Sequence, residues 1–426
     1  MNNESKKIRV PYGLSVHGKE EAKAVFDVVN EHRTAMGRET KAFENKIAEL
    51  FGKKYGVMVN SGSSANLLAL EILNLPPGSE IITPALTFNT TLSPIIQKGF
   101  VPVFVDVEHG TYLIDINKTE AAITKKTRAL MIPSLIGNIP NMARLQKIAK
   151  KHSLYFIEDS CDTLGGTFNG KPTGFYSDIS TTSFYGSHVI NGAGGGGMIS
   201  INNPVWRDQL MVLRGWGRTS SLFADSENME ERFVTKLNDV HYDGKFIFTE
   251  FGYNFLPMEI SAAFGLVQLK KFPKFSALRN NNFQKLFHFF AGYPEFFELP
   301  VTNSQVKTNW LAFPLSIKKH SPFSRFELVT HLEKNNIQTR PIFTGNILSQ
   351  PIFNSAKFKN MDYKSISSLI YGKQVRSAVK RNKQNAYPVA DQVMTHSFVV
   401  GCHQGLNLKH LNYLKRTFQN FLESYK

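Results

Sequence analysis

Short apolar runs alternate with helical patterns through the first 200 residues of the chain. The candidate strands are short apolar runs, and the stretches between them place apolar residues three or four positions apart. Helices are predicted over 37–51, from residue 63 or 64 to 70, and over 143–152. This alternation is typical of an α/β domain with a mostly parallel sheet. The predicted strands are 56–59, 80–82, 101–105, 129–132, 154–157, 179–184 and 198–201.

The pattern changes near residue 270, where an apolar helical stretch (260–269) meets Lys-Lys-Phe-Pro at 270–273. A chain of 426 residues exceeds the usual size of one domain. We therefore predict a large α/β domain over 1–270 and a smaller α+β domain over 271–426. Within the second, 357–383 holds eight basic residues and a single acid. Such a segment is either a mobile insertion or a helix with a solvated basic face.

Composition narrows the class of protein. Hydrophobic residues make up 42% and charged residues 20%, which is enough for a sizeable core. No apolar run reaches membrane-spanning length and residues 1–7 lack a signal-peptide core, so a soluble, cytoplasmic protein is expected. The two cysteines, Cys161 and Cys402, provide no disulfide framework. They are also fewer than the four ligands that a protein-held iron–sulfur cluster normally needs, and no metal site is predicted.

The net charge of +16 is concentrated near the C-terminus. Residues 301–426 contain 18 Lys and Arg against 5 Asp and Glu, a net +13, which leaves +3 for the first 300 residues. The basic residues are scattered singly or in pairs and form no nucleic-acid-binding motif. The charge therefore indicates either an ordinary solvated face or attraction of a phosphorylated small substrate, and no nucleic-acid partner is predicted.

Three segments at the ends of predicted strands carry candidate chemistry. Residues 60–65, Asn-Ser-Gly-Ser-Ser-Ala, open a helix, so Gly62 and Ser63 form either a phosphate seat or an ordinary turn with a helix cap. Asp159 ends a buried strand, where a carboxylate either pairs with a protonated pyridine nitrogen or caps the next helix. Phe88 follows another strand and either stacks on a flat cofactor or packs in the core.

A fourth segment joins these three. Residues 183–188, Ser-Phe-Tyr-Gly-Ser-His, precede four glycines at 194–197. In this order the four segments resemble the DegT-type family of nucleotide-sugar aminotransferases, which depend on pyridoxal phosphate (PLP). The resemblance is dense from about residue 37 to 269 and thinner to the C-terminus. It implies a fold-type-I, aspartate aminotransferase-like enzyme and a functional homodimer.

The resemblance assigns roles by position. It implies that Asp159 holds the pyridine nitrogen and that Phe88 stacks on the ring. Asp162 occupies the place of a usual glutamine, and Gly194 that of a common glutamate. The residues implied to bind the cofactor are Gly62, Ser63, Phe88, Asp159, Asp162, Ser183 and, across the dimer interface, Asn254.

The most informative departure is His188, which stands where the family lysine bonds to the cofactor. No lysine lies between Lys171 and Lys236 to replace it. Histidine at this place resembles the 3-dehydratase subgroup, as do residues 214–218, Arg-Gly-Trp-Gly-Arg, and 401–406, Gly-Cys-His-Gln-Gly-Leu. The resemblance implies that pyridoxamine phosphate (PMP) condenses with a 4-keto-6-deoxy nucleotide sugar, that His188 moves the proton, and that the 3-hydroxyl leaves.

The subgroup has two branches. One carries an iron–sulfur cluster on four cysteines; the other, the colitose-pathway type acting on GDP-4-keto-6-deoxymannose, has none and uses L-glutamate to regenerate PMP. The cysteine count favours the second branch and a role in lipopolysaccharide O-antigen biosynthesis. Open alternatives are a CDP-4-keto-6-deoxyglucose 3-dehydratase, an aminotransferase with a relocated lysine, and an inactive regulatory homologue. Candidate substrate-binding residues, against ordinary surface or structural positions, are Arg214, Arg218, Arg340 and His403.

Overall fold

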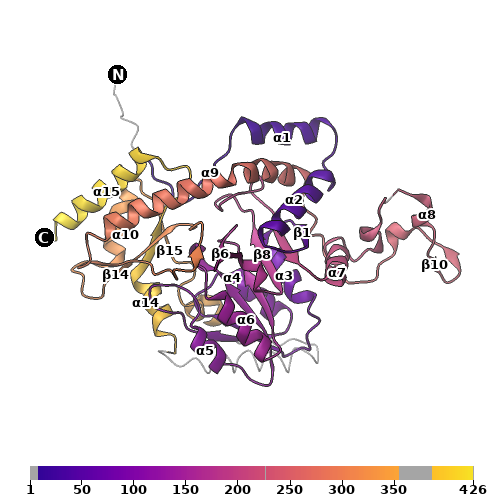
Figure 1. The fold of residues 1–426 in the computed structure, drawn as a ribbon, viewed down its shortest axis with the longest axis horizontal. Coiled ribbons are helices and arrows are strands. Elements are labelled where there is room, and N and C mark those ends of the chain that lie inside the picture. Colours follow the sequence, from indigo (N-terminus) through magenta and orange to yellow (C-terminus); the bar gives the residue numbers. More distant parts are fainter. Residues whose placement is uncertain (1–7, 226, 355–385, 426) are drawn as a thin grey trace.

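A seven-stranded sheet forms the centre of the protein in a computed structural model that describes residues 8–225, 227–354 and 386–425 (Figure 1). The strand order is β1-β9-β8-β5-β4-β2-β3, and β9 alone runs against the other six. The predicted α/β class and the seven predicted strands are confirmed. The strands are β1 (Tyr55–Val59), β2 (Glu80–Pro84), β3 (Val101–Val105), β4 (Thr127–Pro133), β5 (Tyr155–Asp159), β8 (Ile179–Ser183) and β9 (Gly197–Ile201).

Helices connect these strands and cover the sheet (Figure 1). The strands are almost wholly buried, as expected when helices cover both faces of a parallel sheet. Helix α3 packs on β8 and β9, and α6 packs on β5. The helices of this part are α1 (Lys19–Asn30), α2 (Arg38–Leu50), α3 (Gly62–Glu71), α4 (Asn89–Gln97), α5 (Ile116–Ala121), α6 (Met142–Lys151) and α7 (Pro204–Arg214).

A second, four-stranded antiparallel sheet has the order β12-β14-β16-β15. Its aromatic core is continuous with the core of the large sheet. The elements of this part are β12 (Phe297–Glu298), β14 (Phe313–Ile317), α10 (Arg325–Lys334), β15 (Thr339–Pro341), α11 (Pro351–Asn354), α14 (Pro388–His396), β16 (Ser397–Val400) and α15 (Leu408–Glu423). The basic segment 357–383 lies outside the described residues.

The two parts are joined by helix α9 (Glu259–Phe290), which runs without interruption through the predicted domain limit at 270/271. The N-terminal segment also crosses between the parts, because Val10 bridges Ile337 beside the second sheet. Short strands add a further link where β13 (Val306–Lys307) pairs with β6 (Thr167–Phe168), which in turn pairs with β7 (Lys171–Pro172).

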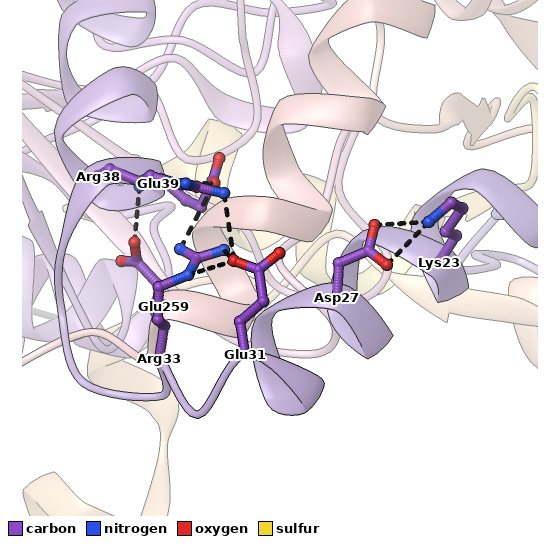
Figure 2. Close-up of polar contacts among 7 residues, drawn as sticks. All are labelled: Lys23, Asp27, Glu31, Arg33, Arg38, Glu39 and Glu259. Atoms are coloured by element: carbon purple, nitrogen blue, oxygen red, sulfur yellow. Dashed lines mark hydrogen bonds and ion pairs between the residues drawn. The ribbon is translucent and has the colours of Figure 1, made fainter.

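The start of α9 is tied to the start of α2 by a buried carboxylate (Figure 2). Glu259 accepts hydrogen bonds from the backbone N–H groups of Gly37, Glu39 and Thr40 at 2.8, 2.6 and 3.1 Å. These are the donors that the first turn of a helix leaves without intrahelical partners. A negative charge at this place is also attracted by the positive end of the α2 dipole. Glu259 thus fixes α2 on α9.

Residues 216–225 and 227–251 form an arm that projects from the body of the protein, with α8 (Met229–Arg232) and β10 (Lys236–Leu237) at its far end (Figure 1). Strand β10 pairs with β11 (Val240–His241) in a two-stranded hairpin. The arm exposes many large apolar side chains, which a monomeric soluble protein rarely gathers in one place. They are Trp216, Leu222, Met229, Phe233, Val234, Leu237, Val240, Tyr242, Phe246, Phe248 and Phe251.

Candidate active site

A cavity of about 390 Å³ opens at the carboxyl ends of the parallel strands. This is where open α/β sheets bind their ligands, because the loops after several strands meet there. The cavity brings together seven of the residues singled out from the sequence: Gly62, Ser63, Phe88, Asp159, Asp162, Ser183 and His188. Its wall is completed by residues that include Asn60, Ser61, Thr90, Thr91, Ser134, Leu135, Cys161, Tyr185, Gly194 and Phe343.

The N-terminus of α3 opens into the cavity at the place where the sequence predicts a phosphate site. Ser61 caps the helix by accepting the Ser64 N–H at 3.1 Å, and Gly62 and Ser63 line the cavity. The first backbone N–H groups of a helix, together with its dipole, favour a bound anion. A side chain at Gly62 would come within 2.6 Å of the Ser183 Cβ and 3.0 Å of the Cys161 Sγ. Glycine is therefore needed to bring α3 against the end of β8, where Ser183 adds a hydroxyl.

Asp159 is the last residue of β5 and is almost fully buried. Its Oδ2 accepts hydrogen bonds from Asn66 Nδ2 at 2.9 Å and from Thr91 Oγ1 at 2.7 Å, and its Oδ1 accepts the Cys161 N–H at 3.2 Å. The three donors fix the orientation of the Asp159 carboxyl group at the cavity wall, a position from which a carboxylate can pair with a protonated ring nitrogen.

His188 follows β8 in a turn that holds its ring. Its Nδ1 lies 3.0 Å from the Ser183 carbonyl oxygen, which only accepts, so Nδ1 carries a hydrogen and Nε2 is the nitrogen free to take a proton. Burial lowers the pKa of His188, and the Arg279 charge acts in the same direction, whereas the Ser183 carbonyl and Asp159 oppose them. A neutral imidazole with one free nitrogen is the form that acts as a general base.

Asp162 is a second buried carboxyl group in the cavity, and its Oδ2 accepts the Ile136 N–H at 2.8 Å. Burial raises the pKa of Asp162 to about 7; the Ile136 hydrogen bond opposes this increase, and the charge of Asp159 adds to it. Around neutral pH Asp162 therefore holds a proton for part of the time. A protonated carboxyl donates a hydrogen bond, as the glutamine amide usual at this position does.

This raised pKa predicts a pH-dependent stability. The folded protein binds a proton at Asp162 that the unfolded chain, with an ordinary pKa near 4, releases. The stabilising contribution is complete below about pH 4 and is lost as the pH rises through 7. Compared with the Asp162→Asn variant, the wild type should lose about 4 kcal/mol of unfolding free energy over this range. Denaturant titrations from pH 4 to 8 measure the difference, and parallel curves for the two proteins would contradict the expectation.

Phe88 and Phe343 close one side of the cavity. Phe88 is half exposed, and its ring meets the Phe343 ring edge-on with centroids 5.6 Å apart. The two rings come from the two parts of the chain, which the hydrogen bond from Thr344 Oγ1 to the Thr87 carbonyl also joins, at 2.7 Å. An exposed ring at a cavity wall is available to stack on a flat ligand.

Two of the four expected substrate-binding residues have structural surroundings instead. Arg214 is buried and pairs with Glu44 at 2.6 Å while donating to the Met58 carbonyl, so its charge is already neutralised away from the cavity. His403 is fully buried against the Pro11 carbonyl, and burial lowers its pKa to about 3. A neutral, enclosed imidazole has no access to substrate. These placements argue against the sequence-based expectation for both residues.

The remaining sequence-predicted residues lie outside the cavity of one chain. Arg218 stacks on the exposed Trp216 ring, with its guanidinium 4.1 Å from the ring centroid. Arg340 is exposed and lies 5.8 Å from the centre of the Tyr12 ring. Asn254 is exposed and bridges Gly215. The structure of a single chain therefore does not bring these three residues to the cavity.

Asn66, Thr91 and Tyr185 belong to the site but were not predicted from the sequence. Asn66 links Asp159 to Thr181, whose hydroxyl it accepts at 2.6 Å. Its one available signal was a polar residue directly before the apolar run Leu-Leu-Ala-Leu of a helix, since a buried amide needs partners. Tyr185 meets the His188 ring edge-on at 6.1 Å. Among the described residues, no cluster suited to holding a metal ion is found, and no helix could span a membrane.

Comparisons with known proteins agree with this geometry. Lipopolysaccharide biosynthesis protein RfbH of Salmonella typhimurium is 34% identical over 97% of this chain and 91% of its own. The dTDP-4-dehydro-2,6-dideoxy-D-glucose 3-dehydratase of Saccharopolyspora spinosa is 37% identical over 82% of this chain and 77% of its own. A structure of GDP-4-keto-6-deoxymannose 3-dehydratase with a trapped PLP–glutamate geminal diamine superposes with a TM-score of 0.79 at 30% identity. The match covers 96% of this chain and 99% of the chain in that structure.

The structural match confirms the predicted aspartate aminotransferase-like fold. The family match extends over residues 16–375, which include every residue that lines the cavity. The chain therefore belongs to the DegT/DnrJ/EryC1/StrS aminotransferase family.

Proposed function

We propose that the protein is a PLP- and PMP-dependent 3-dehydratase of a nucleotide-linked 4-keto-6-deoxyhexose. The observation that carries the proposal is His188, which lies in the cavity with Nε2 free, together with the absence of any lysine among the cavity-lining residues that the structure describes. An imidazole has no primary amine with which to hold the cofactor covalently, so a family member with histidine here is suited to proton transfer.

The residues of the cavity fit the cofactor. The N-terminus of α3 with Ser63 and Ser183 would bind its phosphate, and Phe88 would stack on its ring. Asp159, held by three donors, would pair with the ring nitrogen. When bound, the cofactor supplies an electron sink and, in its amine form, a primary amine for the keto carbon of the sugar.

His188 would take the proton from the carbon beside the cofactor amine and deliver a proton to the departing 3-hydroxyl. The Ser183 carbonyl holds the hydrogen on Nδ1, so the same Nε2 serves both transfers. Asp162 lies beside Asp159 with an elevated pKa, and in its protonated form it would donate to an oxygen of the bound cofactor. The buried surroundings of both groups exclude bulk water and strengthen these contacts.

The substrate is proposed to be of the GDP-4-keto-6-deoxymannose type, with L-glutamate as the amino donor. The support is the solved relative whose title names both the GDP sugar and PLP–glutamate chemistry. The relative named for a dTDP sugar makes the nucleotide a point to be tested. The similarity to RfbH supports a role in lipopolysaccharide biosynthesis. Arg218 and Arg340 are the exposed cations proposed for the diphosphate or the glutamate carboxylates.

We also infer a homodimer. The support is the apolar surface of the arm, which a second copy of the chain would bury. Asn254 follows directly after this arm and is exposed, so it is available to a neighbouring site rather than to its own cavity. Light scattering should give twice the chain mass of 48.0 kDa. A concentration-independent monomer mass would contradict the inference.

The decisive test supplies the purified protein with PMP, L-glutamate and the GDP-, dTDP- or CDP-linked 4-keto-6-deoxyhexose. A dehydratase removes one oxygen atom from the sugar and releases one 2-oxoglutarate and one ammonia per turnover. An aminotransferase instead moves the nitrogen onto the sugar and releases no ammonia. Mass spectrometry of the sugar and an ammonia assay therefore separate the two activities.

Borohydride reduction provides an independent check on a relocated lysine. A stable lysine–cofactor adduct on the wild-type chain would support the aminotransferase and reject the dehydratase. Failure to bind either PLP or PMP would support an inactive homologue.

A further inference from the structure

Arg279, in the middle of α9, is a fully buried cation. Among the residues that the structure describes, no carboxylate lies within ion-pair distance of its guanidinium. Burial lowers the pKa of Arg279 to about 10, so the side chain stays charged at neutral pH. An unpaired buried charge is costly to folding unless its donors are all satisfied. The contacts that satisfy its donors therefore indicate what Arg279 does beside the active site.

The guanidinium of Arg279 donates to four neutral acceptors. Nε donates to the Gln404 side-chain oxygen at 2.7 Å, and Nη1 donates to the backbone carbonyls of Trp310 and Leu311, both at 3.0 Å. The remaining nitrogen, Nη2, lies 3.5 Å from the backbone carbonyl of His188. The planar fork of a guanidinium fixes the relative positions of such acceptors in a way that a single ammonium cannot.

Gln404 gives Arg279 a second route to the same loop. Its Nε2 donates to the Val189 carbonyl at 3.2 Å while its oxygen accepts from Arg279. The carbonyl groups of residues 188 and 189 are therefore both tied to one buried centre. On the opposite side, the Leu311 N–H donates to the Ile136 carbonyl in the loop that contributes Leu135 to the cavity wall.

The charges that act on the His188 ring come from two elements. Arg279 of α9 opposes its protonation, and the Asp159 carboxylate of β5 favours it. Cys161, Asp162 and Tyr185 are the other titratable side chains that line the cavity with His188, and the Tyr185 ring meets the imidazole edge-on. Arg279 thus both donates to the backbone carbonyl of His188 and places a positive charge where it acts on the His188 ring.

We propose that Arg279 is a positioning residue for the reaction base: it holds residues 188–189 through its own hydrogen bond to the His188 carbonyl and through Gln404. Its charge adds to the larger effect of burial in disfavouring protonation of the imidazole. The assignment of His188 as the base rests on the proposed function. The arrangement of Arg279, Gln404 and the loop does not, which allows the two to be tested separately.

The experiment compares Arg279→Met, which removes charge and fork, with Arg279→Lys, which keeps the charge alone. Arg325→Met is the control, since Arg325 is half-buried, lies away from the cavity and, like Arg279, donates to a backbone carbonyl, that of Ser397. The pH titration of His188 is followed by NMR in full-length, PMP-loaded protein with ¹³C-labelled histidine, and the signal is assigned by its loss in His188→Asn. The kcat and KM for the sugar are measured in parallel.

In Arg279→Met the His188 titration should move to higher pH, and kcat should fall about 10- to 100-fold with KM nearly unchanged, because a displaced base loses alignment. In Arg279→Lys the His188 titration should stay at the wild-type pH, and kcat should still fall. Gln404→Leu, which leaves Arg279 in place, should lower kcat without moving the titration and serves if Arg279→Met does not fold.

Wild-type kcat in both Arg279→Lys and Gln404→Leu would overturn the proposal, as would an unchanged titration in a folded Arg279→Met. A wild-type protein that fails to dehydrate any sugar would reject the proposed function alone, because the titration of His188 still reports whether Arg279 acts on it.

Discussion

The His188→Asn variant is expected to retain its cofactor while losing dehydration by about 100- to 10,000-fold, the usual contribution of a positioned acid or base. Asparagine approximates the length of histidine to its first ring atoms and can still donate to the Ser183 carbonyl, so the turn after β8 should be preserved. It has no group that takes up a proton near neutral pH. The phosphate seat, Phe88 and Asp159 are untouched by the change.

Two measurements separate loss of the base from loss of the site. Absorbance titration gives the affinity for PMP, which should stay within about threefold of the wild type, and single-turnover mixing with the sugar gives the rate of the chemical step. His109→Asn is the control, since His109 is exposed and pairs with Glu298 away from the cavity. A wild-type single-turnover rate in His188→Asn would remove His188 from the mechanism.

The fold was predictable to the extent that local patterns determine it. Runs such as Val101–Val105 are buried on both faces, and a buried parallel strand has a continuous apolar sequence that is visible without any partner. Helix α2 was also visible in the sequence, because its apolar residues are spaced so that they fall on one face. The domain limit at 270/271 was drawn from a local change in polarity, and that change, with Pro273, lies inside the continuous helix α9.

The core of the site was predictable because parallel strands place their carboxyl ends together. Asp159 and Ser183 end neighbouring strands β5 and β8, and Gly62 follows β1, so their meeting needed only the strand order. The family resemblance supplied the role of His188, which no local pattern distinguishes from a structural histidine. The cavity then brings these four residues together.

What the sequence did not show are the contacts between distant segments. Arg214 pairs with Glu44, 170 residues away, and His403 bonds to Pro11 nearly 400 residues away, and neither partner is visible in the surrounding motif. Thr91 and Asn66 reach Asp159 from two different helices. The sequence around a polar residue is the same whether a distant partner occupies its side chain or leaves it available to a ligand. Its role can therefore be assigned only when its long-range partners are known.

The Asp159→Asn variant is expected to weaken PLP and PMP binding and to slow turnover, with the affinity falling about 10- to 100-fold, as for loss of a hydrogen bond to a charged group. An amide keeps the shape of the carboxylate and can still accept from Thr91 and Asn66, so the wall of the cavity should survive. It lacks the negative charge that holds a proton on the ring nitrogen. Without that proton, the ring accepts electrons poorly and the chemical step should suffer beyond the loss of binding.

Glu158→Gln is the matched control, because Glu158 precedes Asp159 on β5 and its side chain points to the other face of the sheet. Burial raises the pKa of Glu158, and Ser160, Ser177 and Ser180 donate hydrogen bonds to its carboxyl group, so glutamine keeps the shape of the side chain at a position outside the cavity. That variant should keep wild-type affinity and rate. Equal losses in both variants would assign the effect of Asp159 to the stability of β5, whereas unchanged turnover in Asp159→Asn would show that the reaction does not need a charge at the ring nitrogen.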